Sequence, residues 1–113
     1  MLAHVLLFRV REDVPAAERK ALIDAWAKAL REIPSITRAN VGRRLRIGRE
    51  YEQLMSADYP YAAFIEFENE AGLRAYLDHP VHADMANRFF AVLTDVLIYD
   101  YDMKASPESW LET

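Results

Sequence analysis

The 113-residue chain contains no cysteine, which excludes disulfides, zinc–thiolate centres, iron–sulfur clusters and thiol nucleophiles. It also lacks the glycine-rich loops that hold phosphate groups. Basic residues are few relative to acidic ones: 14 Lys and Arg against 18 Asp and Glu give a net charge of −4, whereas nucleic-acid binders normally carry a basic excess. No apolar run approaches the roughly 18 residues that span a bilayer. We therefore expect neither a nucleic acid nor a membrane as partner.

The composition that remains is typical of a globular protein, with 52% hydrophobic and 28% charged residues. Its length corresponds to one domain, which we expect over residues 1–102, followed by a C-terminal tail over residues 103–113 without a regular period. The first residues lack the basic segment of a signal peptide and lead directly into an apolar stretch. We therefore expect a cytoplasmic protein.

Apolar periodicity predicts strands over residues 2–11, 35–47, 61–68 and 96–101, with a loop over 48–60. Helical spacing predicts a helix from Pro15 to Ile33, which Pro34 ends. The apolar face of this helix comprises Leu22, Ile23, Trp26, Ala27, Leu30 and Ile33. Asn69 is suited to cap a short helix through about Asp78. Pro80 then begins another helix, on which Val81, Met85, Phe89, Val92 and Leu93 share a face.

The resulting order, β-α-β-β-α-β, predicts an α+β fold of the ferredoxin-like, split βαβ type. In this fold an antiparallel four-stranded sheet carries its helices on one face. Here the second helical stretch is divided at Pro80.

Both faces of the predicted sheet are apolar, and only one can be covered by helices. The first strand places Leu2, His4, Leu6, Phe8 and Val10 on one face, with Ala3, Val5, Leu7 and Arg9 on the other. The open face would carry Val5, Leu7, Phe64, Leu97 and Tyr99. Burying five such side chains contributes on the order of 10 kcal/mol before association costs. We therefore expect a homodimer formed sheet against sheet; the alternative is that the C-terminal tail folds back over the sheet.

The most distinctive stretch is Tyr76-Leu77-Asp78-His79-Pro80-Val81-His82. His82 falls in the first turn of a helix, where the helix dipole lowers the pKa of an imidazole and keeps it neutral as a base. Tyr76, on the preceding helix, could donate a hydrogen bond to an oxygen as charge develops. We expect these two side chains to meet His4 and Tyr61 near Trp26 in one apolar pocket, suited to proton abstraction next to a carbonyl.

Three other interpretations of the polar residues stay open. The histidines could simply satisfy backbone groups in a buried turn. His79 and His82 could supply two metal ligands, although no carboxylate spacing completes a familiar motif, and we expect no metal. The basic stretch Arg38, Arg43, Arg44, Arg46 and Arg49 could capture an anion or could be a solvated strand edge that discourages edge-to-edge pairing.

Several segments together resemble the stress-responsive dimeric α/β-barrel (Dabb) family. These are the opening strand HVLLFRV, a helix that ends in IP, Gly42, the stretch AYLDHPVH and the closing LIYDYD. The resemblance covers essentially residues 2–102, and the HPxH stretch with its upstream tyrosine is its most specific part. It implies a ferredoxin-like protomer that pairs through its sheet into a barrel.

The resemblance also implies roles for individual residues. In a plant polyketide cyclase of this family, which closes a linear polyketide by an aldol-type condensation without a cofactor, the base matches His82 and its partner matches Tyr76. Residues that line its pocket match His4, Leu6, Phe8, Ile23, Trp26 and Met85. One pocket histidine of the cyclase is replaced here by Tyr61, which is also expected to bind substrate.

From these observations we expect a cofactor-independent enzyme or ligand-binding homodimer that acts on a hydrophobic aromatic or β-keto compound. A non-catalytic stress-responsive assembly protein and a cofactorless oxygenase of aromatic substrates are the alternatives. The resemblance supports the fold more strongly than it supports any of these functions.

Overall fold

A computed structural model describes residues 1–110 of the chain. The elements in chain order are β1 (Leu2–Val10), α1 (Ala16–Glu32), β2 (Arg38–Arg43), the 3₁₀ helix η1 (Glu50–Leu54), β3 (Tyr61–Phe67), α2 (Glu70–Asp78), α3 (Pro80–Val92), β4 (Leu93–Asp102) and α4 (Pro107–Trp110). The predicted ferredoxin-like order is confirmed, including the division of the second helical stretch at Pro80.

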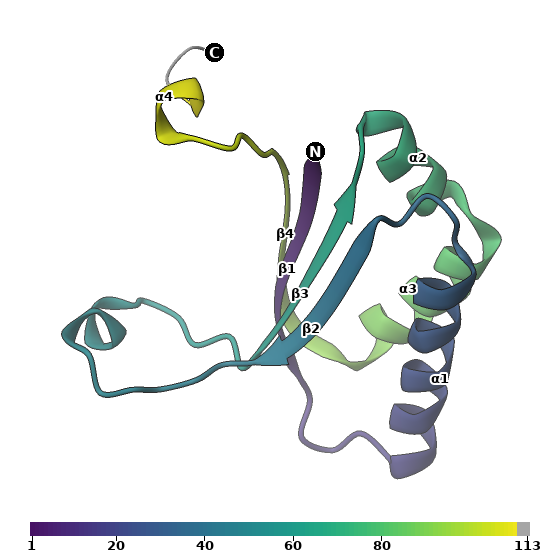
Figure 1. Cartoon of the computed structure of the whole chain (residues 1–113). Helices are drawn as coiled ribbons and strands as arrows, with labels where there is room; N and C mark the ends of the chain where they lie inside the picture. The colour runs from purple at the N-terminus through teal and green to yellow at the C-terminus, as the bar shows by residue number, and fades with distance from the viewer. Residues whose placement is uncertain (111–113) are drawn as a thin grey trace.

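The four strands form one antiparallel sheet in the order β2-β3-β1-β4. Helices α1, α2 and α3 all lie on the same side of this sheet, and no helix of comparable length lies on the other side within the described chain (Figure 1). Along β1, His4 stands opposite Ile65 of β3 and Asp100 of β4, so these three residues share one face.

The two faces of β1 differ as the alternation predicts. His4, Leu6 and Phe8 are buried beneath the helices, whereas Leu7, on the other face, is 36% exposed. The core between sheet and helices continues through Ile65, Phe67 and Phe89. The helix-covered face is therefore the interior of the protomer, and any internal site must lie on it.

The buried stripe of α1 differs from the prediction at Ile23 and Ala27, which are both exposed. The Ile23 side chain is 62% exposed, and the helix instead buries Leu22, Ala25 and Ala29, with Ile33 just beyond its end. Both the predicted and the observed set of buried residues recur every three or four positions, as a helix requires. The apolar pattern alone therefore does not determine which of two adjacent apolar residues faces the core. Helix α1 packs against α3.

Helices α2 and α3 each begin at a residue whose side chain caps the helix. As predicted, Asn69 caps α2: its Oδ1 accepts a hydrogen bond from the backbone N–H of Gly72 at 3.0 Å. His79 ends α2 and begins α3, and its Nδ1 accepts from the backbone N–H of Val81 at 3.1 Å. Pro80 then occupies the first helical position, where its missing N–H costs nothing.

Several boundaries differ from those predicted. Strand β2 is shorter than residues 35–47, and β4 begins at Leu93, which the sequence pattern placed on a helix. The loop over 48–60 contains η1, and the C-terminal tail contains the short helix α4. The remaining tail residues, 111–113, lie outside the described residues. Trp110, at the end of α4, is largely exposed.

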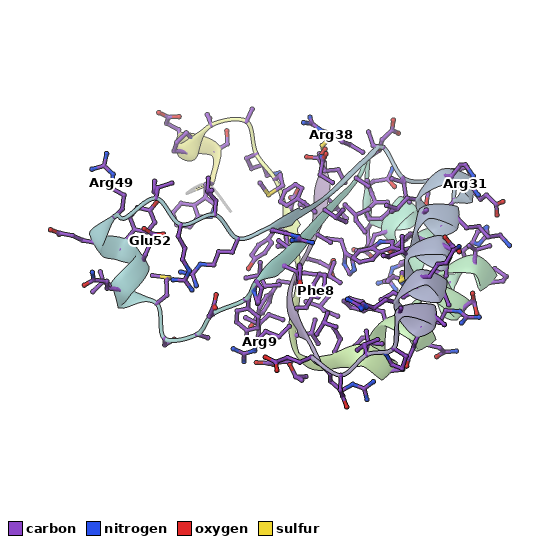
Figure 2. The ribbon with its side chains drawn as sticks, turned by 90° about the horizontal axis from the view of Figure 1, so that it is seen from below. Phe8, Arg9, Arg31, Arg38, Arg49 and Glu52 are labelled. Carbon is purple, nitrogen blue, oxygen red and sulfur yellow. The ribbon has the colours of Figure 1, made fainter. Side chains whose placement is uncertain are left out.

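Residues 44–60 form an extension that we call the arm. It projects from the end of β2 toward the side of the sheet without helices, and η1 lies at its tip (Figure 1). Figure 2 shows Arg49 and Glu52 at this tip, on the opposite side of the sheet from Arg31 of α1. The radius of gyration is 15.7 Å, against about 13 Å for a compact chain of this length.

The base of the arm is held by charged groups. Asp58 accepts a hydrogen bond from Arg44 at 2.6 Å, and its backbone carbonyl accepts one from Arg9 of β1 at 2.8 Å. Arg9 also pairs with Asp95 of β4 at 2.6 Å, and its guanidinium lies 4.9 Å from the ring centroid of Tyr59.

None of the helices described within residues 1–110 is long and apolar enough to cross a membrane.

Candidate functional site

A pocket of about 280 Å³ lies between the sheet and helices α2 and α3, and it contains the predicted base and its partner. Its lining comprises His4, Leu6, Trp26, Ile65, Tyr76, Leu77, His82, Met85, Ala86, Phe89, Phe90, Ile98 and Asp100. We call this the histidine pocket. Apart from the two histidines, Tyr76 and Asp100, the side chains are apolar or contribute an indole, so water is a weak competitor for polar contacts inside it.

The ring of Tyr76 contacts both imidazoles. Its ring centroid is 4.5 Å from that of His82 and 5.9 Å from that of His4, both in edge-to-face geometry. Only 1% of Tyr76 is exposed, and this burial raises the pKa of its hydroxyl to about 12. The phenol therefore stays protonated at neutral pH and can act only as a neutral hydrogen-bond donor or acceptor.

His82 is the third residue of α3, on the turn that faces Tyr76. Burial lowers its pKa, and the charge of His4 lowers it further, while a hydrogen bond to the backbone of Leu77 acts in the opposite direction. From the sequence, the helix dipole is the expected cause of a low His82 pKa, whereas in the structure burial is the main cause. The result is a neutral imidazole near pH 7, as a general base requires.

His4 is held by Asp100, which stands directly opposite it on β4. The distance from Nδ1 of His4 to Oδ1 of Asp100 is 2.5 Å. An ionised carboxylate can only accept, so the proton of this bond belongs to Nδ1, and Nε2 is left without a proton when the ring is neutral. Asp100 was not among the residues predicted for the site. The available signal was its position within LIYDYD, where strand alternation places a carboxylate on the covered face.

The mouth of the histidine pocket is apolar. Leu77 of α2, Phe90 of α3 and Ile98 of β4 all line the pocket and are substantially exposed. Phe90 and Ile98 were likewise absent from the predicted site, because periodicity assigns exposed positions to solvent. Their exposure at the pocket mouth favours entry of an apolar molecule.

Three of the predicted pocket residues lie elsewhere. Phe8, Ile23 and Tyr61 line a second pocket of about 750 Å³ and do not line the histidine pocket. The expectation that Tyr61 meets His4, Tyr76 and His82 is therefore wrong. Tyr61 pairs with Phe8, four residues beyond His4 on β1, and four residues of extended strand span about 13 Å.

Trp26 lines both pockets and stands between them. Its ring centroid lies 5.9 Å from that of Phe8 and 5.5 Å from that of Phe89, and Phe8 and Phe89 are themselves 4.9 Å apart. These three rings form an aromatic partition between the two pockets. Among the predicted residues, His4, Leu6, Trp26, Tyr76, His82 and Met85 share the histidine pocket.

The two histidines of the HPxH stretch have different positions. His82 lines the histidine pocket, whereas His79 uses Nδ1 to cap α3. Within residues 1–110 no group of three or more His, Asp or Glu side chains is placed to hold a metal ion. The arginines of residues 38–49 also separate: Arg44 and Arg46 pair with Asp58, while Arg43 lines the larger pocket.

The four-stranded antiparallel sheet, with helices α1, α2 and α3 on one side, defines a ferredoxin-like fold. The family model described as the stress responsive A/B barrel domain (Dabb) matches residues 2–103, and the chain belongs to this family. A stress-response A/B barrel domain-containing protein of Arabidopsis thaliana is 21% identical over 110 residues, which cover 97% of this chain and 93% of that protein.

Solved structures agree with this fold. A dimeric ferredoxin-like protein of unknown function from Thermobifida fusca is 26% identical, with a TM-score of 0.69 over 90% of each chain. A hydroxynitrile lyase from Passiflora edulis is 13% identical, with a TM-score of 0.76 over 93% of this chain and 94% of that one. A cofactor-independent oxygenase, SnoaB from Streptomyces nogalater, is 18% identical, with a TM-score of 0.65 over 94% and 95%. At these identities the lyase and the oxygenase show the shared fold alone.

Proposed function

We propose that this protein is a cofactor-independent enzyme that acts on a hydrophobic aromatic or β-keto compound in the histidine pocket. His82 serves as the general base and Tyr76 as the hydrogen-bond donor. The observation that carries the proposal is the 4.5 Å contact between the rings of Tyr76 and His82 inside a buried, mostly apolar pocket. The presence of a lyase and a cofactor-independent oxygenase on the same fold supports it.

The chemical step follows from the two protonation states. Neutral His82 accepts a proton from the carbon next to a substrate carbonyl. The electron pair of that C–H bond forms the C=C bond of an enolate, and the π electron pair of the carbonyl moves to its oxygen. The protonated Tyr76 hydroxyl donates a hydrogen bond to the enolate oxygen so formed. When the enolate carbon attacks a second carbonyl, the new alkoxide takes the proton back from His82. No external oxidant or reductant is needed.

Mutation of His82 tests the proposal. We would screen phenols, β-keto acids and linear polyketide mimics by thermal shift, and then measure turnover of the compounds that bind. A ligand at about one hundred times its Kd stabilises the fold by roughly 2.7 kcal/mol, which is several degrees for a domain of this size. His82→Ala should abolish turnover while the fold survives.

The same HPxH stretch offers a matched control. His79→Asn removes the neighbouring imidazole but keeps a side chain that caps helices well, so turnover should persist. Tyr76→Phe should lower kcat by roughly a hundred-fold, the usual effect of losing one donor to a developing oxyanion. Equal turnover in wild type and His82→Ala would overturn the proposal, and oxygen uptake with an aromatic substrate would favour the oxygenase instead.

We also propose that the protomer pairs with a second copy through the face of the sheet without helices. Leu7, Tyr99 and Tyr101 are exposed on this face, and the arm beside it exposes further apolar side chains. Those of the arm are Leu45, Ile47, Tyr51, Leu54 and Met55. So large an apolar surface is typical of an interface, and the description of the Thermobifida fusca protein as dimeric supports the same arrangement.

Leu7→Glu tests the pairing, because it places a charge at the centre of the exposed face. We expect a dimer of twice 13.1 kDa for the wild type and a monomer for the variant in sedimentation equilibrium. Ala75→Glu, on the exposed side of α2, is the control and should remain dimeric. A wild-type monomer would contradict the proposal, and it would leave the arm and the sheet without the partner that we assign to them.

A further inference from the structure

The larger pocket has the size of a ligand site and a different character from the histidine pocket. It measures about 750 Å³ and lies under α1, at the end of the sheet where β1 leaves toward the helix. Its walls include Phe8, Leu22, Trp26 and Tyr61, with the rings of Phe8 and Tyr61 stacked at 5.6 Å. Pockets that hold organic ligands typically measure 300–1,000 Å³ and have such apolar and aromatic walls.

The charges around this pocket are unbalanced. Its lining contains Arg11, Arg19 and Arg43 but only one acidic residue, Glu12, although the chain as a whole carries a net charge of −4. Arg11 pairs with Asp13 and Glu18, which lie outside the lining, so the surplus consists of Arg19 and Arg43. Within residues 1–110, Arg19 and Arg43 form no ion pair, and the guanidinium of Arg43 lies 6.0 Å from the ring centroid of Tyr61. A surplus of guanidinium groups beside an aromatic wall is suited to an organic anion.

Two hydrogen-bond donors of the lining are buried without an acceptor in the described part of the chain. One is the indole Nε1 of Trp26, and the other is Nε of Arg11. The carboxylate of Asp13 lies 3.6 Å from Nε of Arg11, too far for a hydrogen bond. Buried indole and guanidinium N–H groups normally have a partner, and leaving one without an acceptor costs about 1–3 kcal/mol. An acceptor supplied by a ligand would remove this cost.

We propose that the larger pocket binds a carboxylate with an aromatic or long apolar body. The body would lie against Phe8, Trp26 and Tyr61, and the carboxylate would pair with Arg43 and Arg19 at the rim. This site is separated from His82 by the aromatic partition, so the inference does not rest on the chemistry proposed for the histidine pocket.

Calorimetric titration with a matched pair of probes tests the site: 1-pyrenebutyrate, and the neutral 1-pyrenebutanol of the same shape. We expect the wild type to bind the carboxylate about ten-fold or more tightly than the alcohol, since a charge-assisted pair contributes more than 1.4 kcal/mol. Arg43→Gln should remove this difference. Arg38→Gln, an exposed arginine on the same strand outside the pocket, should retain it.

Two further variants distinguish this inference from the proposed function. Trp26→Phe replaces the indole with a smaller ring that contacts the apolar body less, so it should weaken both probes, whereas His82→Ala should change neither affinity. Equal affinity for the two probes, an unchanged preference in Arg43→Gln, or no binding of either probe would overturn the inference. Weaker binding in His82→Ala would also overturn it, because the probe would then occupy the histidine pocket.

Discussion

His4 and Asp100 form a pair across neighbouring strands, with Nδ1 of the imidazole 2.5 Å from the carboxylate oxygen. The histidine is buried, whereas the aspartate side chain is 44% exposed at the edge of the sheet. The pair therefore fixes the orientation and tautomer of an internal imidazole from a position that remains in contact with solvent. Asp100 is thus a positioning residue, and it should act on the reaction through His4, whose ring contacts Tyr76 and whose charge lowers the pKa of His82.

Asp100→Ala should leave His4 in a mixture of tautomers. Nitrogen shifts of the imidazole, measured by NMR, should show a proton on Nδ1 alone in the wild type and on both nitrogens, in exchange, in the variant. We expect kcat to fall roughly ten- to a hundred-fold through misorientation, with a smaller change in KM. Asp100→Asn, which keeps an acceptor, should recover part of the loss. Asp102→Ala, whose carboxylate pairs with Lys104 outside the pocket, should change neither readout.

The pH dependence of turnover should report His82. Burial and the charge of His4 hold its pKa below the ordinary 6.5. A base must be unprotonated, so kcat/KM should rise with pH through a midpoint below 6.5. It should then stay level at neutral pH, because the Tyr76 hydroxyl keeps its proton until about pH 12. A midpoint at or above 6.5 would contradict the assignment of His82 as the buried base.

The fold could be predicted from the sequence because its signals are local and mutually consistent. Strand β1 is a run of nine residues whose side chains are mostly apolar on both faces. Asn69 and Pro80 each mark the start of a helix by a mechanism that acts within one turn. The sequence does not determine which face of α1 is buried. Leu22 and Ile23 are adjacent and equally apolar, so only packing against α3 determines which of them is buried.

The site could be predicted only in part, since its residues come together through sheet register. Tyr76 and His82 are six residues apart, and their meeting follows from two short helices joined at His79. The pairing of His4 with Asp100 spans 96 residues and depends on the alignment of β1 with β4. No local pattern indicates that alignment, and none shows that Trp26 divides the interior into two pockets.

The cap at His79 should contribute to stability and not to chemistry. Its Nδ1 accepts the backbone N–H of Val81, which has no acceptor inside α3. His79→Ala should lower the free energy of unfolding by about 1 kcal/mol, and His79→Asn should restore most of it because asparagine is a strong N-cap residue. Urea denaturation at neutral pH measures both. If His79→Ala lost turnover without losing stability, the first histidine would belong to the site as well.

The Tyr76 hydroxyl should make the fold sensitive to alkali. Its pKa is about 12 in the folded protein and about 10 in the unfolded chain, so between these values the folded state binds more protons. The free energy of unfolding should therefore fall as pH rises through this window, by at most about 2–3 kcal/mol.

Comparison with Tyr76→Phe isolates this effect, since the other tyrosines titrate equally in both proteins. No hydrogen bond of the Tyr76 hydroxyl occurs within residues 1–110, so the variant keeps the packing and should match the wild type at pH 8. In urea denaturation the two stability curves should separate above pH 10, with the variant the more stable. Curves that stay parallel would mean that Tyr76 ionises as readily in the folded protein as in the unfolded chain. It could not then remain the protonated donor in alkaline solution, and the enolate would lose its partner above pH 10.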